Sequence, residues 1–270
     1  MNGFREIEPC KFVFVVGTPG AGKSLFCKEL ATVLDGKGLR CDIQGDYPYL
    51  QLLYRTDPLG PRSNRFRPGK EGAEFVVTDP LVYDEALELL HKNVLLQQTA
   101  TVKIIEFARP RYDTAFLYHT LGSLLQSAIV HISTKLEVCV ERNERRKRIL
   151  EELKRNIDRR LRGAPPTHIY DENPDVHYVP PEVMSEFYAK DTDEDELRSR
   201  DQKLILSLLP ARSYVCIENN DDNMQTYREV AREVTEERLL PLITGGESYR
   251  DYYGRRFNEI SEVLGSYRSA

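Results

Sequence analysis

The feature that most constrains the fold of this chain is an eight-residue loop near its N-terminus. Its residues match the Walker A pattern G-x-x-x-x-G-K-[ST] in full: Gly17, Thr18, Pro19, Gly20, Ala21, Gly22, Lys23 and Ser24. The apolar run Phe12–Val16 precedes this loop, and residues 23–35 follow it with apolar side chains at helical spacing. The pattern predicts a strand buried on both faces, then a glycine turn, then a helix.

The residue types of this loop suit the binding of a nucleotide phosphate. Glycines allow successive backbone N–H groups to face the β-phosphate, which also meets the positive end of the helix dipole. We expect Lys23 to bridge the β- and γ-phosphates and Ser24 to ligate Mg²⁺. The loop therefore predicts a site for ATP with Mg²⁺, in which all eight loop residues contribute to nucleotide binding.

Short apolar runs and amphipathic segments alternate along the chain. We expect strands at residues 12–16, 41–44, 102–106, 128–132 and 214–218. We expect helices at residues 23–35, 81–90, 114–127, 135–148 and 224–237. Residues 57–72 are rich in Pro, Gly and Arg, and predict an irregular insertion. The alternation predicts an α/β fold with a parallel sheet flanked by helices.

On these motifs the chain resembles the P-loop kinase group, which contains nucleoside, nucleotide and small-molecule kinases. The N-K-x-D motif of GTPases, the L-S-G-G-Q motif of transporter ATPases and a helicase motif series are not found. The resemblance implies a five-stranded core and a helical lid that closes over ATP. We accordingly expect a core of residues 1–140 and 202–270, with a lid insertion at residues 141–201.

Two carboxylates follow expected strands at the edge of the sheet where the loop lies. Resemblance to these kinases implies that Asp46 binds the acceptor hydroxyl and acts as the catalytic base, although Gly45-Asp46 also suits an ordinary turn. Glu106 ends the run 102–106, where a Walker B acid orients Mg²⁺ or its waters. We predict catalytic roles for both and a metal-linked role for Glu106.

Arginines after the same strand are candidates for binding the acceptor. Arg109 and Arg111 lie in a stretch that faintly resembles strand-end motifs of nucleoside and thymidylate kinases, without matching either intact. They suit a phosphate or acceptor ligand, but an arginine in this position also commonly anchors a loop. Both alternatives stay open on the sequence.

The remaining candidates come from the expected lid and from the last expected strand. The resemblance implies that Arg142 and Arg146, one helical turn apart, act as catalytic lid arginines on the transferred phosphoryl group, although a solvated basic helix also explains them. His177 is a candidate acceptor contact or a structural hydrogen-bonding residue. Asn219 and Asn220 are candidates for contact with adenine, or members of a turn that caps a helix.

Composition excludes several other classes of protein. A net charge of −5 disfavours a protein that coats nucleic acid. The five cysteines are scattered and never form C-x-x-C, so neither a disulfide framework nor a zinc site is indicated. Neither a secretory leader nor a membrane span is recognisable, and we expect a cytoplasmic enzyme.

The preferred hypothesis is an ATP- and Mg²⁺-dependent phosphotransferase that acts on a small-molecule acceptor, with a nucleoside or nucleotide favoured. One alternative is a kinase of a nucleic-acid end or of an activated sugar, similar to polynucleotide kinases or zeta toxins. Another is a switch protein that binds ATP without catalysing transfer. The sequence leaves open the acceptor and the oligomeric state.

Overall fold

The main sheet of the protein has five parallel strands. The computed structural model describes residues 10–60, 63–69, 74–96, 100–109, 112–116, 118–119, 123–124, 126–162, 178–186, 188 and 213–245. The strands are β1 (Phe12–Val16), β2 (Cys41–Gly45), β5 (Val102–Phe107), β6 (Ser127–Ser133) and β7 (Tyr214–Glu218). They lie in the order β2-β5-β1-β6-β7, and all the pairings are parallel. The predicted α/β class and the five expected strands are confirmed.

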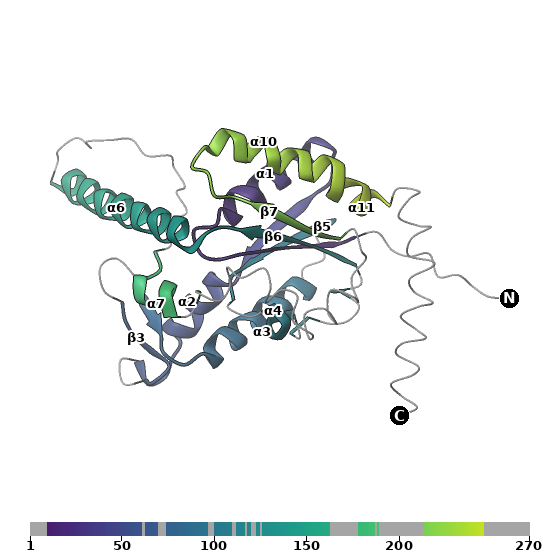
Figure 1. Cartoon of the computed structure of the whole chain (residues 1–270). Coiled ribbons are helices and arrows are strands. Elements are labelled where there is room, and N and C mark those ends of the chain that lie inside the picture. Colours follow the sequence, from purple (N-terminus) through teal and green to yellow (C-terminus); the bar gives the residue numbers. More distant parts are fainter. Residues whose placement is uncertain are drawn as a thin grey trace, which may run out of the picture.

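Helices cover both faces of this sheet (Figure 1). One face carries α1 (Lys23–Gly36), α10 (Met224–Val234), a π-helical segment (Thr235–Leu239) and α11 (Leu240–Thr244). The other face carries α3 (Leu81–Leu96) and α4 (Tyr112–Phe116). No helix in the described ranges is long and apolar enough to cross a membrane.

The alternation of side chains along β1 explains why its sequence is wholly apolar. Val13 and Val15 pack into the core beneath α1 and α10. Phe12, Phe14 and Val16 point to the opposite face and pack into the core beneath α3 and α4. A central parallel strand is buried on both sides, so every position must be apolar.

Two elements in residues 47–77 differ from expectation. Helix α2 (Tyr47–Arg55) was not predicted, although Pro48 in its first turn is a helix-start signal. The insertion expected to be irregular contains strand β3 (Phe66–Pro68), which pairs antiparallel with β4 (Phe75–Val77). Phe66 is buried, so a tertiary contact stabilises a strand that its local Pro- and Gly-rich sequence disfavours.

The prediction of one continuous helix over residues 114–127 is also wrong in part. Helix α4 ends at Phe116, and the backbone at Tyr118 and His119 turns. His119 is buried against Phe14, with ring centroids 4.5 Å apart. Ser127 already belongs to β6, where it pairs with Phe12. Ser123 and Leu124 are helical again, so the expected helix is interrupted at the His119 turn and ends before β6 rather than being absent.

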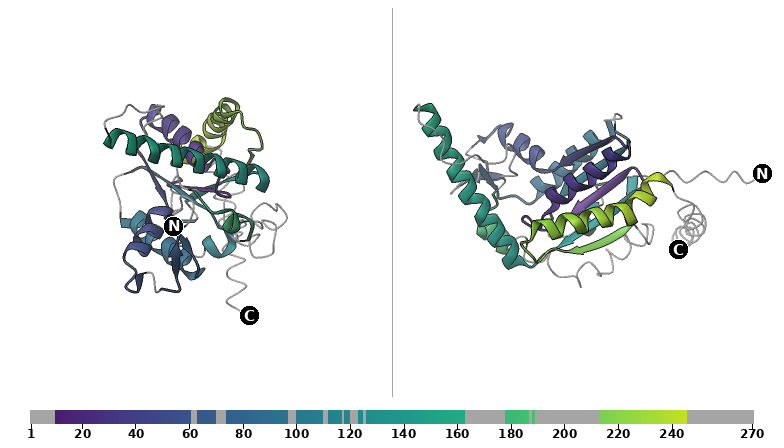
Figure 2. Two further views of the ribbon diagram at one scale, coloured as in Figure 1. Left: turned by 90° about the vertical axis from the view of Figure 1, so that its left-hand side faces the viewer. Right: turned by 90° about the horizontal axis from the view of Figure 1, so that it is seen from above.

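Helix α6 (Leu136–Leu161) is longer than the helix expected at residues 135–148 and extends beyond the sheet (Figure 2). It runs without interruption through the predicted boundary between residues 140 and 141. The structure next describes α7 (Pro181–Glu186), whose contacts include α6. Most of the remaining expected lid lies outside the described residues.

A buried pair of histidines in the core beneath α3 predicts a pH-dependent stability. The Nδ1 atoms of His91 and His119 lie 3.0 Å apart, and neither Nε2 atom has a hydrogen-bond partner. Burial lowers the pKa of His119 to about 3, helped by the neighbouring His91, and burial also lowers the pKa of His91. An unfolded histidine titrates near pH 6.5, so acid protonates the unfolded chain first.

The free energy of unfolding is therefore expected to be at its full value above about pH 6.5 and to fall as the pH decreases toward about 3, the pKa of folded His119. Urea unfolding at a series of pH values measures this dependence. His119→Leu removes one proton acceptor of the unfolded state, so its unfolding free energy should depend less steeply on pH. Equal slopes for the variant and the wild type would contradict this origin.

Candidate active site

A cavity of about 250 Å³ lies beside the P-loop, next to residues at the carboxyl ends of β2 and β5. Ligands of open parallel sheets bind at this edge. The predicted site residues that line the cavity are Pro19, Gly20, Gly22, Lys23, Ser24, Asp46, Glu106 and Arg146. Of the other loop residues, Thr18 and Ala21 are buried and do not line the cavity. The fold thus brings together predicted residues from four separate parts of the chain.

The loop requires glycine where the backbone passes close to neighbouring elements. Gly20 has φ of 92°, and a Cβ there would lie 2.6 Å from the carbonyl oxygen of Cys139. Gly22 has φ of 104°, and a Cβ there would lie 2.6 Å from Nδ2 of Asn219. Both the left-handed conformation and the lack of space exclude other residues.

The Lys23 ammonium group is held against the loop that it follows. Its Nζ donates hydrogen bonds to the carbonyl oxygens of Gly17 at 2.8 Å and Thr18 at 3.1 Å. The side chain is nearly buried but borders the cavity. A positive charge is therefore positioned where the loop N–H groups can receive phosphate oxygens.

The two predicted metal-linked residues are in direct contact. Ser24 Oγ donates a hydrogen bond of 2.9 Å to Oε1 of Glu106. Glu106 follows Ile104 at the two-residue period of β5, on the face that carries α1. A hydroxyl and a carboxylate fit Mg²⁺, which takes its other ligands from water and phosphate oxygens.

Asp46 also borders the cavity, and its carboxylate forms an ion pair with Arg109. The two side chains are only 14% and 5% exposed. Asp46 precedes α2 but makes no side-chain capping bond, so helix capping does not explain it. The carboxylate instead faces the guanidinium of Arg109.

Arg109 is fixed from several directions. Its Nη1 and Nη2 atoms donate to the carbonyl oxygens of Ala108 at 2.6 Å and Tyr83 at 2.7 Å. Its guanidinium also lies 5.1 Å from the centre of the Tyr83 ring. These contacts agree with the anchoring alternative, in which Arg109 holds the Asp46 carboxylate.

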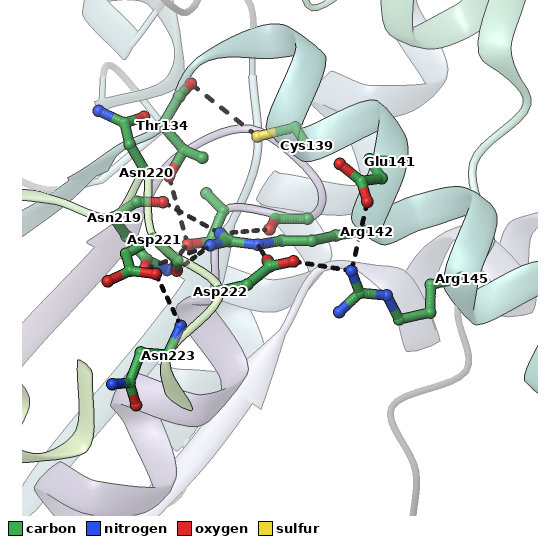
Figure 3. Close-up of polar contacts among 12 residues, drawn as sticks. Thr134, Cys139, Glu141, Arg142, Arg145, Asn219, Asn220, Asp221, Asp222 and Asn223 are labelled. Carbon is green, nitrogen blue, oxygen red and sulfur yellow. Dashed lines mark hydrogen bonds and ion pairs between the residues drawn. The ribbon is translucent and has the colours of Figure 1, made fainter. Parts of the chain in front are cut away.

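Arg142 connects the P-loop to the turn between β7 and α10 (Figure 3). Its Nη1 donates to the carbonyl oxygens of Gly20 at 3.4 Å and Asn219 at 3.1 Å, and its Nη2 donates to that of Asp221 at 2.6 Å. Its Nε also pairs with Asp222 at 3.1 Å. Arg142 does not line the cavity, whereas Arg146, one turn later on α6, does.

The two asparagines after β7 hold neighbouring backbone segments in the same network (Figure 3). Asn219 Nδ2 donates to the carbonyl oxygen of Ala21 at 2.6 Å. Asn220 Oδ1 accepts a hydrogen bond of 2.8 Å from the backbone N–H of Lys135, directly before α6. These contacts agree with the structural alternative for both residues, and contact with adenine stays a prediction.

Two predicted site residues cannot be located in the structure, and the sequence analysis missed several residues of the cavity wall. Arg111 and His177 lie outside the described residues. The cavity wall also includes Tyr47, Leu50 and Tyr188, which the sequence did not single out as site residues. Their signal in the sequence is weak, because only the unpredicted helix α2 turns Tyr47 and Leu50 toward the P-loop.

Comparisons with known proteins extend the description of the fold. Neither protein-family models nor curated protein sequences match the chain. Among solved structures, a shikimate kinase from Acinetobacter baumannii in complex with shikimate is 14% identical, with a TM-score of 0.40, over 90% of this chain and 96% of that chain. A sugar kinase from Janibacter sp. is 13% identical, with a TM-score of 0.45, over 87% and 98%.

An APS kinase from Mycobacterium tuberculosis in complex with AMPPNP and APS is 14% identical, with a TM-score of 0.39, over 85% of this chain and 99% of that chain. These similarities are distant and concern the fold alone. The five-stranded parallel sheet that the motifs predicted is present in the chain itself, and it is the layout that the resemblance to the P-loop kinase group implies.

Proposed function

We propose that this protein is an ATP- and Mg²⁺-dependent phosphotransferase that phosphorylates a hydroxyl group of a small molecule. The observation that carries the proposal is the Ser24–Glu106 contact, which lies in the same cavity as Lys23 and Asp46. Phosphate-binding groups, a metal-binding pair and a candidate base therefore border one space. Phosphoryl transfer needs these three components and little covalent chemistry from the protein.

In the proposed reaction, the acceptor oxygen attacks the γ-phosphorus while the bond from the γ-phosphorus to the β,γ-bridging oxygen breaks, and ADP leaves. Asp46 receives the proton of the acceptor hydroxyl. Arg109 holds the Asp46 carboxylate in position, and Lys23 stabilises the negative charge on the phosphate oxygens. Mg²⁺, when bound by Ser24 and Glu106 with the phosphates, supplies further neutralisation of charge.

Arg146 is the proposed lid arginine, because it borders the cavity from α6. Arg142 is proposed to act indirectly, by holding the P-loop at Gly20. The division into a core of residues 1–140 and 202–270 and a lid of residues 141–201 remains part of this proposal, as does a cytoplasmic location. The two asparagines are proposed to shape the adenine side of the loop.

The direct test is incubation of the protein with γ-labelled ATP, Mg²⁺ and separate panels of nucleosides, nucleotides, sugars and oligonucleotides. A labelled small molecule supports the proposal. Labelled oligonucleotide ends or a labelled activated sugar would support the alternative kinases. ATP hydrolysis that no acceptor stimulates, with no labelled product, would support the switch. Absence of ATP binding in calorimetry would overturn the proposal.

Glu106→Gln is expected to raise the Mg²⁺ concentration required for half-maximal activity by about 10-fold, because it removes a negative charge beside the metal. Glutamine retains an oxygen that can accept the Ser24 hydrogen bond, so the loop should keep its shape. A Mg²⁺ titration of activity measures the effect. Glu218→Gln is the matched control, because Glu218 also ends a strand but does not line the cavity. Superimposable titrations of Glu106→Gln and wild type would remove Glu106 from the metal site.

A further inference from the structure

Beside the P-loop cavity lies a second, smaller hollow of about 50 Å³, which we call the neck. The two spaces share Tyr47, Leu50 and Tyr188 in their walls. Beyond the neck lies a third hollow of about 270 Å³, which shares Val76 and Tyr178 with the neck. These three adjoining hollows, which we call the groove, extend from the P-loop to the β3–β4 hairpin and α7.

The neck is lined mainly by aromatic and aliphatic side chains. Its aromatic residues are Tyr47, Phe75, Tyr83, Tyr178 and Tyr188. The rings of Tyr47 and Phe75 are nearly parallel, with an interplanar angle of 13° and centroids 6.1 Å apart. A narrow space between such side chains suits a flat ring, because aromatic rings pack in offset-stacked or edge-to-face pairs.

The charges around the neck disfavour an anionic group within it. Among the described residues that line the neck, the one charged residue is Glu74. Its carboxylate already accepts hydrogen bonds from Gln51 and Arg55. Neither Lys nor Arg occurs in that described lining. A phosphate or carboxylate there would need a cationic partner to offset its desolvation.

The nearest cations already have partners or face the nucleotide. Arg109 pairs with Asp46, and Lys23 and Arg146 border the P-loop cavity, where the nucleotide phosphates are proposed to lie. At the far hollow, Arg67 pairs with Glu182 at 3.3 Å, so the charges of the two side chains offset each other. The groove therefore offers an aromatic surface at its centre, with the candidate base at the P-loop end.

We propose that the neck binds a flat, unphosphorylated ring of the acceptor, whose hydroxyl group reaches Asp46. Asp46 and Tyr47 are adjacent and both line the P-loop cavity. The part of the acceptor molecule that joins its ring to its hydroxyl group is therefore short. This is the chemistry of a nucleoside, and the described lining of the neck offers no cation to the phosphate of a nucleoside monophosphate. The inference rests on the proposed function, because the hydroxyl that it places is the phosphoryl acceptor.

The first test compares each common nucleoside with its own 5′-monophosphate as acceptors of label from γ-labelled ATP. At least one nucleoside should be phosphorylated, with kcat/KM at least about 10-fold above that of its monophosphate, because the monophosphate adds an anion without a partner. Preference for monophosphates overturns the inference while the proposed function stands. Phosphorylation of no nucleoside by a protein that binds ATP also overturns the inference. Failure to bind ATP in calorimetry overturns the proposed function itself.

The second test replaces one ring of the neck and uses a matched ring outside it. Phe75 and Phe66 both lie on the β3–β4 hairpin and pack edge to face, with centroids 5.5 Å apart, but only Phe75 lines the neck. Phe75→Leu should raise the KM for the preferred nucleoside about 3- to 10-fold and leave the KM for ATP unchanged. Phe66→Leu should lower the melting temperature without that rise in KM.

An unchanged nucleoside KM in Phe75→Leu, or the same rise in both variants, would overturn the assignment of the neck. Melting curves of both variants establish that they are folded at the assay temperature. The comparison of nucleosides with monophosphates uses the wild-type protein, so it decides the inference even if a variant fails to fold.

Discussion

Lys23→Ala is expected to reduce phosphoryl transfer by about 10³-fold, because it removes the positive charge that stabilises the transferred phosphoryl group. The two carbonyl groups that accept hydrogen bonds from Lys23 belong to the buried residues Gly17 and Thr18, so the variant leaves two buried acceptors without their donor, at a cost of about 1 to 3 kcal/mol. The melting temperature should therefore fall by several degrees, and the kinetics are measured well below it. Steady-state kinetics, ATP calorimetry and thermal unfolding together measure the three quantities.

Lys28→Ala is the matched control for Lys23→Ala. Lys28 lies on the same helix, α1, but it is exposed and does not line the cavity. The same loss of charge should leave turnover within about twofold of wild type, since surface substitutions away from a site have small effects. Equal turnover in Lys23→Ala and Lys28→Ala would refute the phosphate-binding role of Lys23.

Asp46→Asn is expected to lower kcat by about 10²- to 10⁴-fold, because the amide cannot accept the proton of the acceptor hydroxyl. The affinity for ATP should change little, since Asp46 is proposed to act on the acceptor. Single-turnover kinetics with the preferred acceptor and calorimetry with ATP separate the two quantities. An equal loss in ATP affinity would make Asp46 a structural residue of the nucleotide site.

The ion pair with Arg109 adds a second effect of the Asp46 substitution. Asparagine still offers an oxygen to the guanidinium, but the nearly buried charge of Arg109 loses its counter-ion. We expect a measurable fall in the free energy of unfolding, so kinetics must be measured well below the melting temperature. Asp42→Asn, on the same strand β2, is the control for loss of a carboxylate that does not line the cavity.

The sequence was sufficient wherever the signal is local. The run Phe12–Val16 and the glycine pattern after it predicted β1, the loop and α1, because burial on both faces and positive φ angles restrict the residues at each position. Ser24 and Glu106 were both predicted near a metal from their places in a loop and at a strand end. The structure brings the two side chains into contact at 2.9 Å, and their role at a metal stays a prediction.

Elements stabilised by distant contacts were harder to predict. Strand β3 depends on pairing with β4 and on the burial of Phe66, and the turn at His119 depends on packing against Phe14. Neither neighbour is visible in the local sequence. Local propensity therefore indicated an irregular segment in the first case and a continuous helix in the second.

The tertiary structure alone decided how the candidate polar residues are paired. Asp46 and Arg109 follow different strands, and they meet because β2 and β5 are parallel neighbours. Arg142 reaches Gly20 and Asn219 because α6 begins beside the turn after β7. The sequence determined which residues carry charge, but the long-range order of the strands determined which charges meet, and hence which residues border the cavity.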